Sequence, residues 1–256
     1  MIYLYNITNV LKRTKSSILK SDIESRFYMK YFFTRLLRLI FGLFLYSLGI
    51  VVTMNAHIGY APWDVLHVGM AKTIGMSIGT VSIIAGIVIG ILTVLLGEKL
   101  GLGTLLNMVL IGLFLDILIE LKFIPIASNF VYGLLMVIVG LFIIALASYY
   151  YIGSGFGAGP RDSLMVALTR KTGLPVGVCR GTIELLAVLI GWRLGGMVGI
   201  GTIISAFVIG FCVQLTFKLL KFDATTIKHE TLDQTFKMLI GMKKEPLKDT
   251  DITGNH

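Results

Sequence analysis

The segment Gly59-Tyr60-Ala61-Pro62-Trp63-Asp64 decides the fold, because its pattern returns 98 residues later as Gly157-Ala158-Gly159-Pro160-Arg161-Asp162. At the same offset, and without gaps, residues 36–116 align with residues 134–214, and eight glycines of the first stretch meet glycines of the second. Compositional bias does not explain the coincidence of Pro and Asp, because both are scarce in this chain. The sequence therefore predicts an internal repeat.

The chain around these segments is strongly apolar. Its mean hydropathy is +0.86 and 14% of its residues are charged, whereas an ordinary soluble domain carries about 25% charged residues. The first 38 residues hold eight of the 23 Lys and Arg but only two of the 14 Asp and Glu. Because the excess of positive charge lies in the tails, the composition indicates a membrane protein with basic cytoplasmic ends and no nucleic-acid partner.

Six stretches are continuously apolar over the roughly 20 residues that a membrane-spanning helix needs. They do not alternate between apolar and polar residues as barrel strands do, so we expect helices. The predicted spans are residues 36–54, 78–97, 102–121, 129–151, 177–195 and 200–218. The predicted fold class is an all-α membrane protein in which six transmembrane helices form two inverted three-helix repeats, each with a short broken or re-entrant helix.

The repeat and the spans divide the chain into four regions. These are a basic cytoplasmic arm (1–35), a first three-span repeat (36–121), a second, inverted repeat (129–218) and a cytoplasmic tail (219–256). Three crossings are an odd number, so the second copy enters the membrane from the opposite face. Inverted repeats recur in secondary transporters, because exchanging the conformations of the two halves turns a central site from one face to the other.

The positive charges of the short loops predict the orientation. With the N-terminus in the cytoplasm, six crossings return the C-terminus to the same side. Both basic tails then lie inside, together with Lys99, Arg161, Arg170, Lys171 and Arg180. Only Lys72, Lys122 and Arg193 lie outside. The sequence thus predicts a multi-pass protein with both termini cytoplasmic.

Each repeat contains a predicted helix of 13 residues, 62–74 and 160–172, which is too short to cross a bilayer. Pro62 and Pro160 suit a first helical turn, and Gly59 and Gly157 allow the sharp turn before it. Two interpretations remain open. Either these helices lie flat at opposite membrane surfaces and their Asp residues only cap them, or they are re-entrant and build a site near the midplane.

A Gly-x-Gly-Thr turn precedes the last span of each repeat. Its residues are Gly101, Gly103 and Thr104 in the first copy, and Gly199, Gly201 and Thr202 in the second. No Lys follows the turn as it would in a phosphate-binding loop. We therefore expect tight links between antiparallel spans.

Ionisable side chains within a membrane are costly and indicate function by default. The candidate solute-binding residues are Asp64, His67, Asn107, Asp116, Arg161, Asp162, Glu184 and Gln214. Two alternatives stay open: Asp116 is a snorkelling or capping carboxylate about one turn from the outer surface, and Glu184 forms a local i, i+4 ion pair with Arg180. The sequence holds no catalytic triad, metal-ligand set or nucleotide fingerprint, so we expect no catalytic residue, no metal, no cofactor and no enzyme.

Three strings of residues are specific enough to carry a family resemblance: Gly59-Tyr-Ala-Pro62-Trp63-Asp64-Val65-Leu66-His67, then Gly79-Thr80, then Gly101-Leu-Gly103-Thr104-Leu-Leu-Asn107. In them the chain resembles the YczE-like bacterial membrane proteins, which are close to the wider YitT group. The resemblance covers roughly residues 35–230 and includes Phe222-Asp223-Ala-Thr-Thr226 and His229-Glu230. It implies a bacterial plasma (inner) membrane protein and assigns no substrate or reaction.

Two functions follow from these features. The first is a secondary permease for a small solute that works by alternating access. The second is a membrane-embedded regulatory or assembly protein that recruits a cytoplasmic partner through its basic tails. The lipid bilayer is the one partner that both require, and homo-oligomerisation is left open.

Overall fold

The computed structural model is built from helices and describes the backbone of residues 2–240 and the side chains of residues 29–237. The elements are α1 (Ile2–Asn55), α2 (Pro62–Ile74), α3 (Ile78–Leu95), α4 (Leu102–Leu121), α5 (Phe130–Ile152), α6 (Pro160–Thr172), α7 (Val176–Arg193), α8 (Ile200–Leu219), a 3₁₀ turn (Ala224–Thr226) and α9 (Leu232–Ile240). The backbone over this range contains no strand. The prediction of an all-α protein is confirmed.

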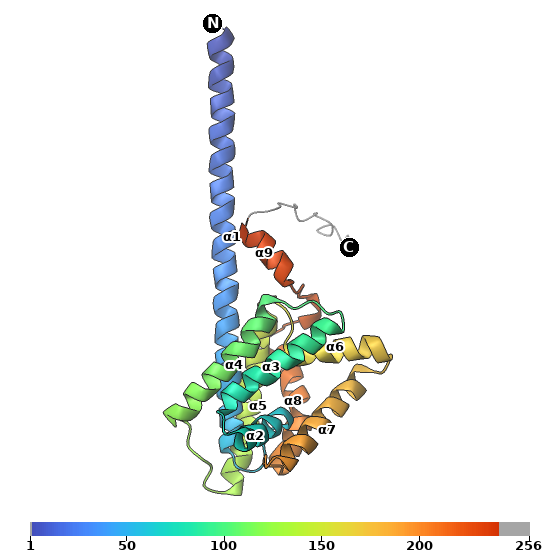
Figure 1. Ribbon diagram of the computed structural model, residues 1–256. Helices are drawn as coiled ribbons and strands as arrows, with labels where there is room; N and C mark the ends of the chain where they lie inside the picture. Colours follow the sequence, from blue (N-terminus) through green and yellow to red (C-terminus); the bar gives the residue numbers. More distant parts are fainter. Residues whose placement is uncertain (1, 241–256) are drawn as a thin grey trace, which may run out of the picture.

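Helix α1 is much longer than the span predicted within it. It runs unbroken from Ile2 to Asn55 and projects far beyond the bundle that the other helices form (Figure 1). Residues 2–41 contain neither Gly nor Pro, so nothing in them interrupts a helix. The basic arm predicted as a region of its own, residues 1–35, is therefore a continuation of the first span over the part that the structure describes.

Five helices of the described chain are long and apolar enough to cross a membrane: Met29–Asn55 within α1, α3, α4, α5 and α8. They establish a multi-pass membrane protein. The stretch predicted as a further span, 177–195, forms α7. This helix is 18 residues long, as is α3. It is not among the five, because it carries Arg180, Glu184 and Arg193.

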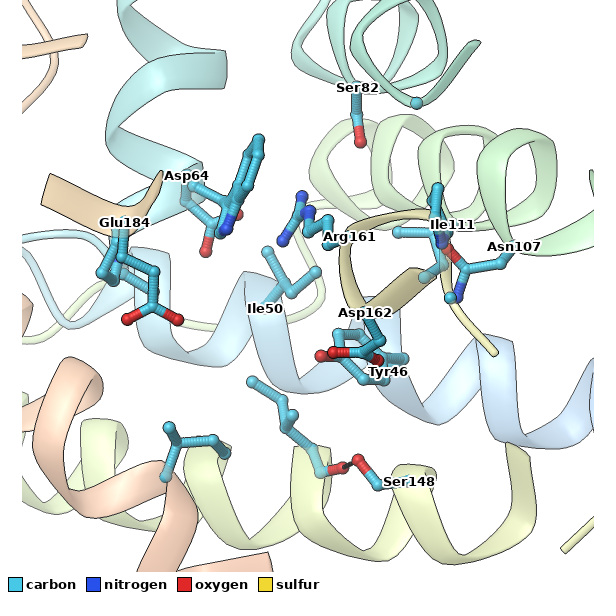
Figure 2. A pocket seen from close by; sticks show the side chains of 18 of the residues that line it. Tyr46, Ile50, Asp64, Ser82, Asn107, Ile111, Ser148, Arg161, Asp162 and Glu184 are labelled. Atoms are coloured by element: carbon cyan, nitrogen blue, oxygen red, sulfur yellow. Dashed lines mark hydrogen bonds between the residues drawn. The ribbon is translucent and has the colours of Figure 1, made fainter. Parts of the chain in front are cut away.

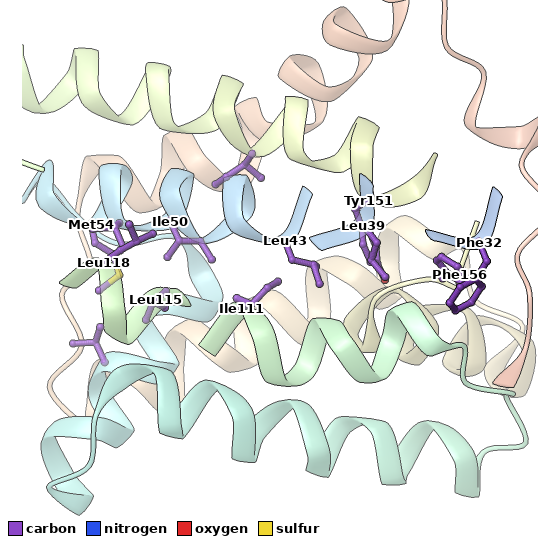
Figure 3. Packing of buried hydrophobic residues seen from close by; sticks show 13 residues of the cluster. Phe32, Leu39, Leu43, Ile50, Met54, Ile111, Leu115, Leu118, Tyr151 and Phe156 are labelled. Atoms are coloured by element: carbon purple, nitrogen blue, oxygen red, sulfur yellow. The ribbon is translucent and has the colours of Figure 1, made fainter. Parts of the chain in front are cut away.

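The centre of the bundle is the pair α1 and α5, which pack along one another more extensively than any other two helices. Gly49 and Gly140 allow this approach, since a side chain on either would press on the backbone carbonyl of the other. Helix α4 then packs on α1, and α8 packs on α5 to a similar extent. Figure 3 shows the resulting core, in which Leu43 of α1 faces Ile111 of α4.

Each short helix packs against a helix of the other half of the chain: α2 against α7, and α6 against α3. The contacts at their ends correspond. The Lys72 ammonium donates a hydrogen bond to the carbonyl of Gly195 at 3.0 Å, and the Arg170 guanidinium donates one to the carbonyl of Leu96 at 3.0 Å. Helix α2 is enclosed by its neighbours, with seven of its 13 residues buried. Helix α2 is therefore an internal element of the helical bundle.

The turns before the short helices also correspond. Gly59 and Gly157 both have φ near +114°, a conformation that only glycine adopts readily. The N–H of Gly201 donates to the carbonyl of Ile58, and the N–H of Gly103 donates to that of Phe156, each at 2.7 Å. The turn before α2 is thus docked on the start of α8, and the turn before α6 on the start of α4.

The Gly-x-Gly-Thr segments form the tight links that the sequence predicts. In each one the threonine side chain accepts a hydrogen bond from the backbone N–H of the first glycine: Thr104 from Gly101 at 3.2 Å, and Thr202 from Gly199 at 3.1 Å. These caps fix the starts of α4 and α8 in the same way.

The two halves differ in the packing of their second and third long helices. Helices α3 and α4 pack closely, and a side chain at Gly79 would overlap the carbonyl of Gly112 and the carboxylate of Asp116. Across the described residues, α7 and α8 share almost no contact. At the equivalent glycines, Gly177 and Gly210, a methyl group in place of the hydrogen would meet no atom within 4 Å. We call the first half closed at this point, because α3 and α4 are in contact, and the second half open, because α7 and α8 are apart.

The segment after α8 folds back on the body of the protein. The Glu230 carboxylate forms an ion pair with Arg35 of α1, and its backbone N–H donates to the carbonyl of Gly155 at 2.8 Å. Helix α9 follows directly and spans Leu232–Ile240. The final residues 241–256 lie outside the described part of the chain.

Candidate functional site

A cavity of about 180 Å³ lies where the starts of α2 and α6 approach the long helices. All eight helices from α1 to α8 contribute to its lining. Figure 2 shows charged side chains directed into it from both short helices and from α7. The cavity therefore joins the two halves of the chain at the positions of the repeated Pro-x-Asp motif.

Helix α2 contributes Asp64 and His67. Because Pro62 begins the helix, Asp64 falls in its first turn and His67 one turn later on the same face. Both side chains line the cavity, and they are only 5% and 3% exposed. The face that the sequence spacing predicts is the face that meets the cavity.

Helix α6 contributes Arg161 and Asp162 at the equivalent turn. The Arg161 guanidinium lies over the ring of Trp63, 4.4 Å from its centroid, in a cation–π contact that links the two short helices. Asp162 is exposed where Asp64 is buried, although both line the cavity. The side of the cavity formed by α6 is thus the open side.

Helix α7 contributes an ion pair. The Arg180 guanidinium donates to the Glu184 carboxylate at 2.9 Å, and the two residues are one helical turn apart. Both line the cavity. The predicted i, i+4 pair is confirmed, and these two charges compensate each other locally.

Two residues that the sequence does not single out, Tyr46 and Tyr151, line the cavity together with Trp63. The polar part of the wall also includes Ser82, Ser148 and Ser205. The hydroxyl of Tyr151 is buried and has no hydrogen-bond partner among the described residues. Aromatic residues are common in membrane helices, so only their helical register relative to Asp64 and Asp162 could have identified them. The rest of the wall is mainly apolar: Ile50, Ile89, Met108, Ile111, Leu141, Ile144, Met165, Ile183 and Ile209.

Six of the eight predicted site residues line this cavity: Asp64, His67, Asn107, Arg161, Asp162 and Glu184. Asp116 and Gln214 do not. The Asp116 carboxylate accepts hydrogen bonds from the N–H of Gly79 at 2.7 Å and from the hydroxyl of Ser77 at 2.5 Å.

Asp116 thus caps the start of α3, which agrees with the alternative that it is a capping carboxylate. Its counterpart Gln214 is exposed on α8. The structure therefore does not bring these two residues together with the other six. Depth along a helix was readable from the sequence, whereas the side of the helix that faces the cavity depends on how the helices pack.

The chemistry of the cavity is that of a polar binding site with an apolar wall. No group of three His, Cys, Asp or Glu side chains among residues 29–237 is close enough to hold a metal ion. Apart from the Arg180–Glu184 pair, the charges in the wall are those of Asp64, Arg161 and Asp162. Such an arrangement can bind a small charged solute and orient it by hydrogen bonds and charge.

Comparison with known proteins places the chain in a family. Residues 33–218 match the model of a family of unknown function, DUF6198. The chain is 34% identical over 178 residues to the uncharacterized membrane protein YczE of Bacillus subtilis, which covers 68% of this chain and 81% of that protein.

Two further relatives are similar over most of their length. An uncharacterized protein of Haemophilus influenzae is 33% identical over 184 residues, covering 71% of this chain and 83% of that protein. The uncharacterized protein YyaS of Bacillus subtilis is 25% identical over 177 residues, covering 68% and 88%. No solved structure matches the chain. The sequence match over residues 33–218 and the similarity to YczE show that this chain belongs to the DUF6198 family and is a YczE-like membrane protein.

Proposed function

We propose that the protein is a six-span permease of the bacterial inner membrane, built from two inverted three-helix repeats, that moves a small solute by alternating access. The observation that carries the proposal is the cavity lined by Asp64 and Asp162, one from each half of the chain. Buried charge is costly in a membrane protein and marks solute or ion pathways. A rigid scaffold would gain nothing from a charged cavity between its halves.

The matching details of the two halves support the inverted repeat. The turns at Gly59 and Gly157, and the hydrogen bonds from Lys72 and Arg170, occur at the same 98-residue offset. In this arrangement α7 is the sixth span, and its Arg180–Glu184 pair faces the cavity instead of lipid. That location accounts for two of the three charged residues of α7, and the third, Arg193, is at the end of the helix.

The difference between the halves supports alternating access. The contact of Gly79, Gly112 and Asp116 joins the start of α3 to the second half of α4, and the separated pair Gly177 and Gly210 lies at the start of α7 and in the second half of α8. In an inverted repeat these two places lie at opposite faces of the membrane. With both termini cytoplasmic, the closed place is outside and the open place is inside, which describes an inward-facing state.

Neutralising the two aspartates tests the proposal. A deletion strain is complemented with the wild-type protein, with Asp64→Asn or with Asp162→Asn, and small-molecule pools in cells and medium are profiled. We expect the wild type to restore at least one pool and both variants to fail at equal protein levels in the membrane. Full complementation by both variants, or no difference between the deletion strain and the wild type, would refute the permease.

The same strain tests the alternative function, recruitment of a cytoplasmic partner through the tails. Deletion of residues 1–30 leaves the described cavity intact, because the residues lining it begin at Tyr46. A permease lacking residues 1–30 should still restore the pools, whereas a regulatory or assembly protein that works through its basic arm should not. Glu230 docks the C-terminal segment on the body, so deletion of 225–256 is less informative.

A further inference from the structure

The charges in the cavity do not balance within the protein. Arg180 and Glu184 satisfy each other at 2.9 Å. This leaves the two carboxylates of Asp64 and Asp162 and the single guanidinium of Arg161. A buried charge such as that of Asp64 is unfavourable unless an opposite charge or hydrogen bonds compensate it. The wall therefore has an excess of one negative charge.

The carboxylates also lack partners of their own. Among the described side chains, no Lys, Arg or His lies within 4.0 Å of either Asp64 or Asp162 as an ion-pair partner. Neither short helix has a side-chain cap at its N-terminus. Asp64 is 5% exposed, so the cavity is the one place from which its carboxylate can gain a partner.

A second, independent group in the wall lacks a partner. The hydroxyl of Tyr151, on α5, is buried and accepts or donates no hydrogen bond within the described structure, and the residue is 5% exposed. A buried hydroxyl without a hydrogen bond is unfavourable. Together with Asp64, it offers a hydrogen-bond acceptor to a ligand from a different helix.

Arg161, the cation of the wall that is outside the Arg180–Glu184 pair, already has a contact. The Arg161 guanidinium lies 4.4 Å from the centroid of the Trp63 ring, so a cation–π contact holds it in place. An apolar part of the wall is formed by Ile50, Ile111 and Ile144. A ligand that fits would place a positive group near the carboxylates and a short hydrocarbon part against the isoleucines.

From this distribution we infer that the cavity binds a small organic cation, an aliphatic amine whose ammonium group lies between Asp64 and Asp162. The inference rests on the proposed function for the identity of the cavity as a solute site. The cavity is small, about 180 Å³, so the expected solute is a short mono- or diamine.

Trp63 provides a direct measurement of binding. The chain has two tryptophans, and Trp192 is 58% exposed and outside the cavity. The variant Trp192→Phe leaves Trp63 as the single tryptophan reporter. The full chain with this substitution, in lipid nanodiscs, is titrated with short mono- and diamines and with alcohols and carboxylates of the same carbon skeleton. We expect a saturable change in Trp63 fluorescence with amines and none with the matched alcohols or carboxylates.

Variants in the same background assign the binding to the carboxylates. Asp64→Asn and Asp162→Asn should weaken amine binding at least about tenfold, because each removes a charged hydrogen-bond partner. Glu120→Gln is the matched control, since Glu120 is exposed on α4 outside the cavity. Arg161→Gln should tighten amine binding, because it removes a like charge, and a variant that is merely damaged would not do so.

The outcomes separate this inference from the permease. Binding of carboxylates in place of amines, an equal response to all three classes, or no saturable response to any amine would overturn the inference. Amine binding without flux into proteoliposomes would keep the inference and refute the permease. Flux of a non-cationic solute that depends on Asp64 would keep the permease and refute the inference.

Discussion

The two halves of this chain share a sequence pattern but not a packing arrangement. Helices α3 and α4 meet at Gly79 and Gly112, and Asp116 ties the contact together through the N–H of Gly79. Helices α7 and α8 carry glycines at the equivalent positions, Gly177 and Gly210, but are apart. The first four N–H groups of a helix have no partner within it, so the carboxylate provides one half with a bond that the other half lacks. One pattern is therefore compatible with both a closed and an open pair.

The largest effect is expected from cross-linking the two pairs of helix ends. In a background without Cys179 and Cys212, the pair Ser77→Cys and Asp116→Cys should form a disulfide almost completely. The reason is that the Ser77 hydroxyl oxygen lies 2.5 Å from a carboxylate oxygen of Asp116. The equivalent pair, Pro175→Cys and Gln214→Cys, should cross-link slowly and only when the second half closes. Gel mobility after mild oxidation measures both.

These yields decide whether the difference between the halves is static. Complete and rapid cross-linking of both pairs in the same preparation would contradict the open arrangement of α7 and α8. A total lack of cross-linking at 175 and 214, even during transport, would mean that the second half never closes. Single-cysteine variants serve as controls for intermolecular disulfides.

Substitution of the glycines by alanine should affect the halves in opposite directions. Gly79→Ala places a methyl group against the carbonyl of Gly112 and should destabilise the fold by about 1–3 kcal/mol, the usual cost of overpacking. Gly177→Ala meets no atom within 4 Å and should stabilise the fold by about 0.5–1 kcal/mol, since Ala favours a helix over Gly.

Thermal unfolding of the purified variants in detergent checks this difference, with the wild type as reference. Equal destabilisation by the two substitutions would show that Gly177 is packed in solution. The transport assay adds a second reading: Gly177→Ala should slow transport despite its added stability, because it obstructs closure of α7 on α8.

Removal of the polar side chains of Asp116 and Gln214, which occupy equivalent positions in the two halves, should have a smaller effect. Asp116→Ala removes two hydrogen bonds at the start of α3 and should cost about 1–2 kcal/mol, as the loss of a helix cap does. Gln214→Ala removes an exposed side chain and should remain within about 0.5 kcal/mol of the wild type. Chemical denaturation in mixed micelles can resolve the two. A comparable loss for Gln214→Ala would contradict the open end of α8.

The smallest effect is expected where the halves are alike. Lys72→Met and Arg170→Met each remove one exposed hydrogen bond to a carbonyl at 3.0 Å, and Arg170 also forms an ion pair with Glu98 at 3.1 Å. Exposed ion pairs contribute about 0–1 kcal/mol, so both variants should lose less than about 1 kcal/mol. Melting temperatures measured side by side test this. A loss of several degrees in only one variant would show that the two halves are held at these ends by different contacts.

Local features of the fold followed from the sequence, and relations between distant helices did not. Pro62 and Gly75 bound α2 as their positions predict. The Arg180–Glu184 pair could be predicted because it depends on helical spacing alone. The charge of α7 was also visible in the sequence, but whether it faced lipid or a cavity was not.

The site was predictable where the repeat supplied a second copy of the pattern. Asp64 and Asp162 line one cavity, as their shared motif suggests. Tyr46 and Tyr151 were missed, because their repeat counterparts are the unrelated residues Ile144 and Thr53. The open gap between α7 and α8 could not be predicted at all, since the glycine pattern there is the same as in the closed pair.

The packing of α2 against α7 has a consequence for the order in which the protein assembles. Gly69 of α2 contacts the backbone of Gly191, which lies 122 residues later in the chain. Until the ribosome has synthesised α7, the face of α2 that α7 covers has no helix to pack against. The helices of the first half must therefore remain partly folded in the bilayer, accessible to membrane proteases, until α7 is inserted. A chain truncated before α7 should accordingly be degraded rather than accumulate as a stable half.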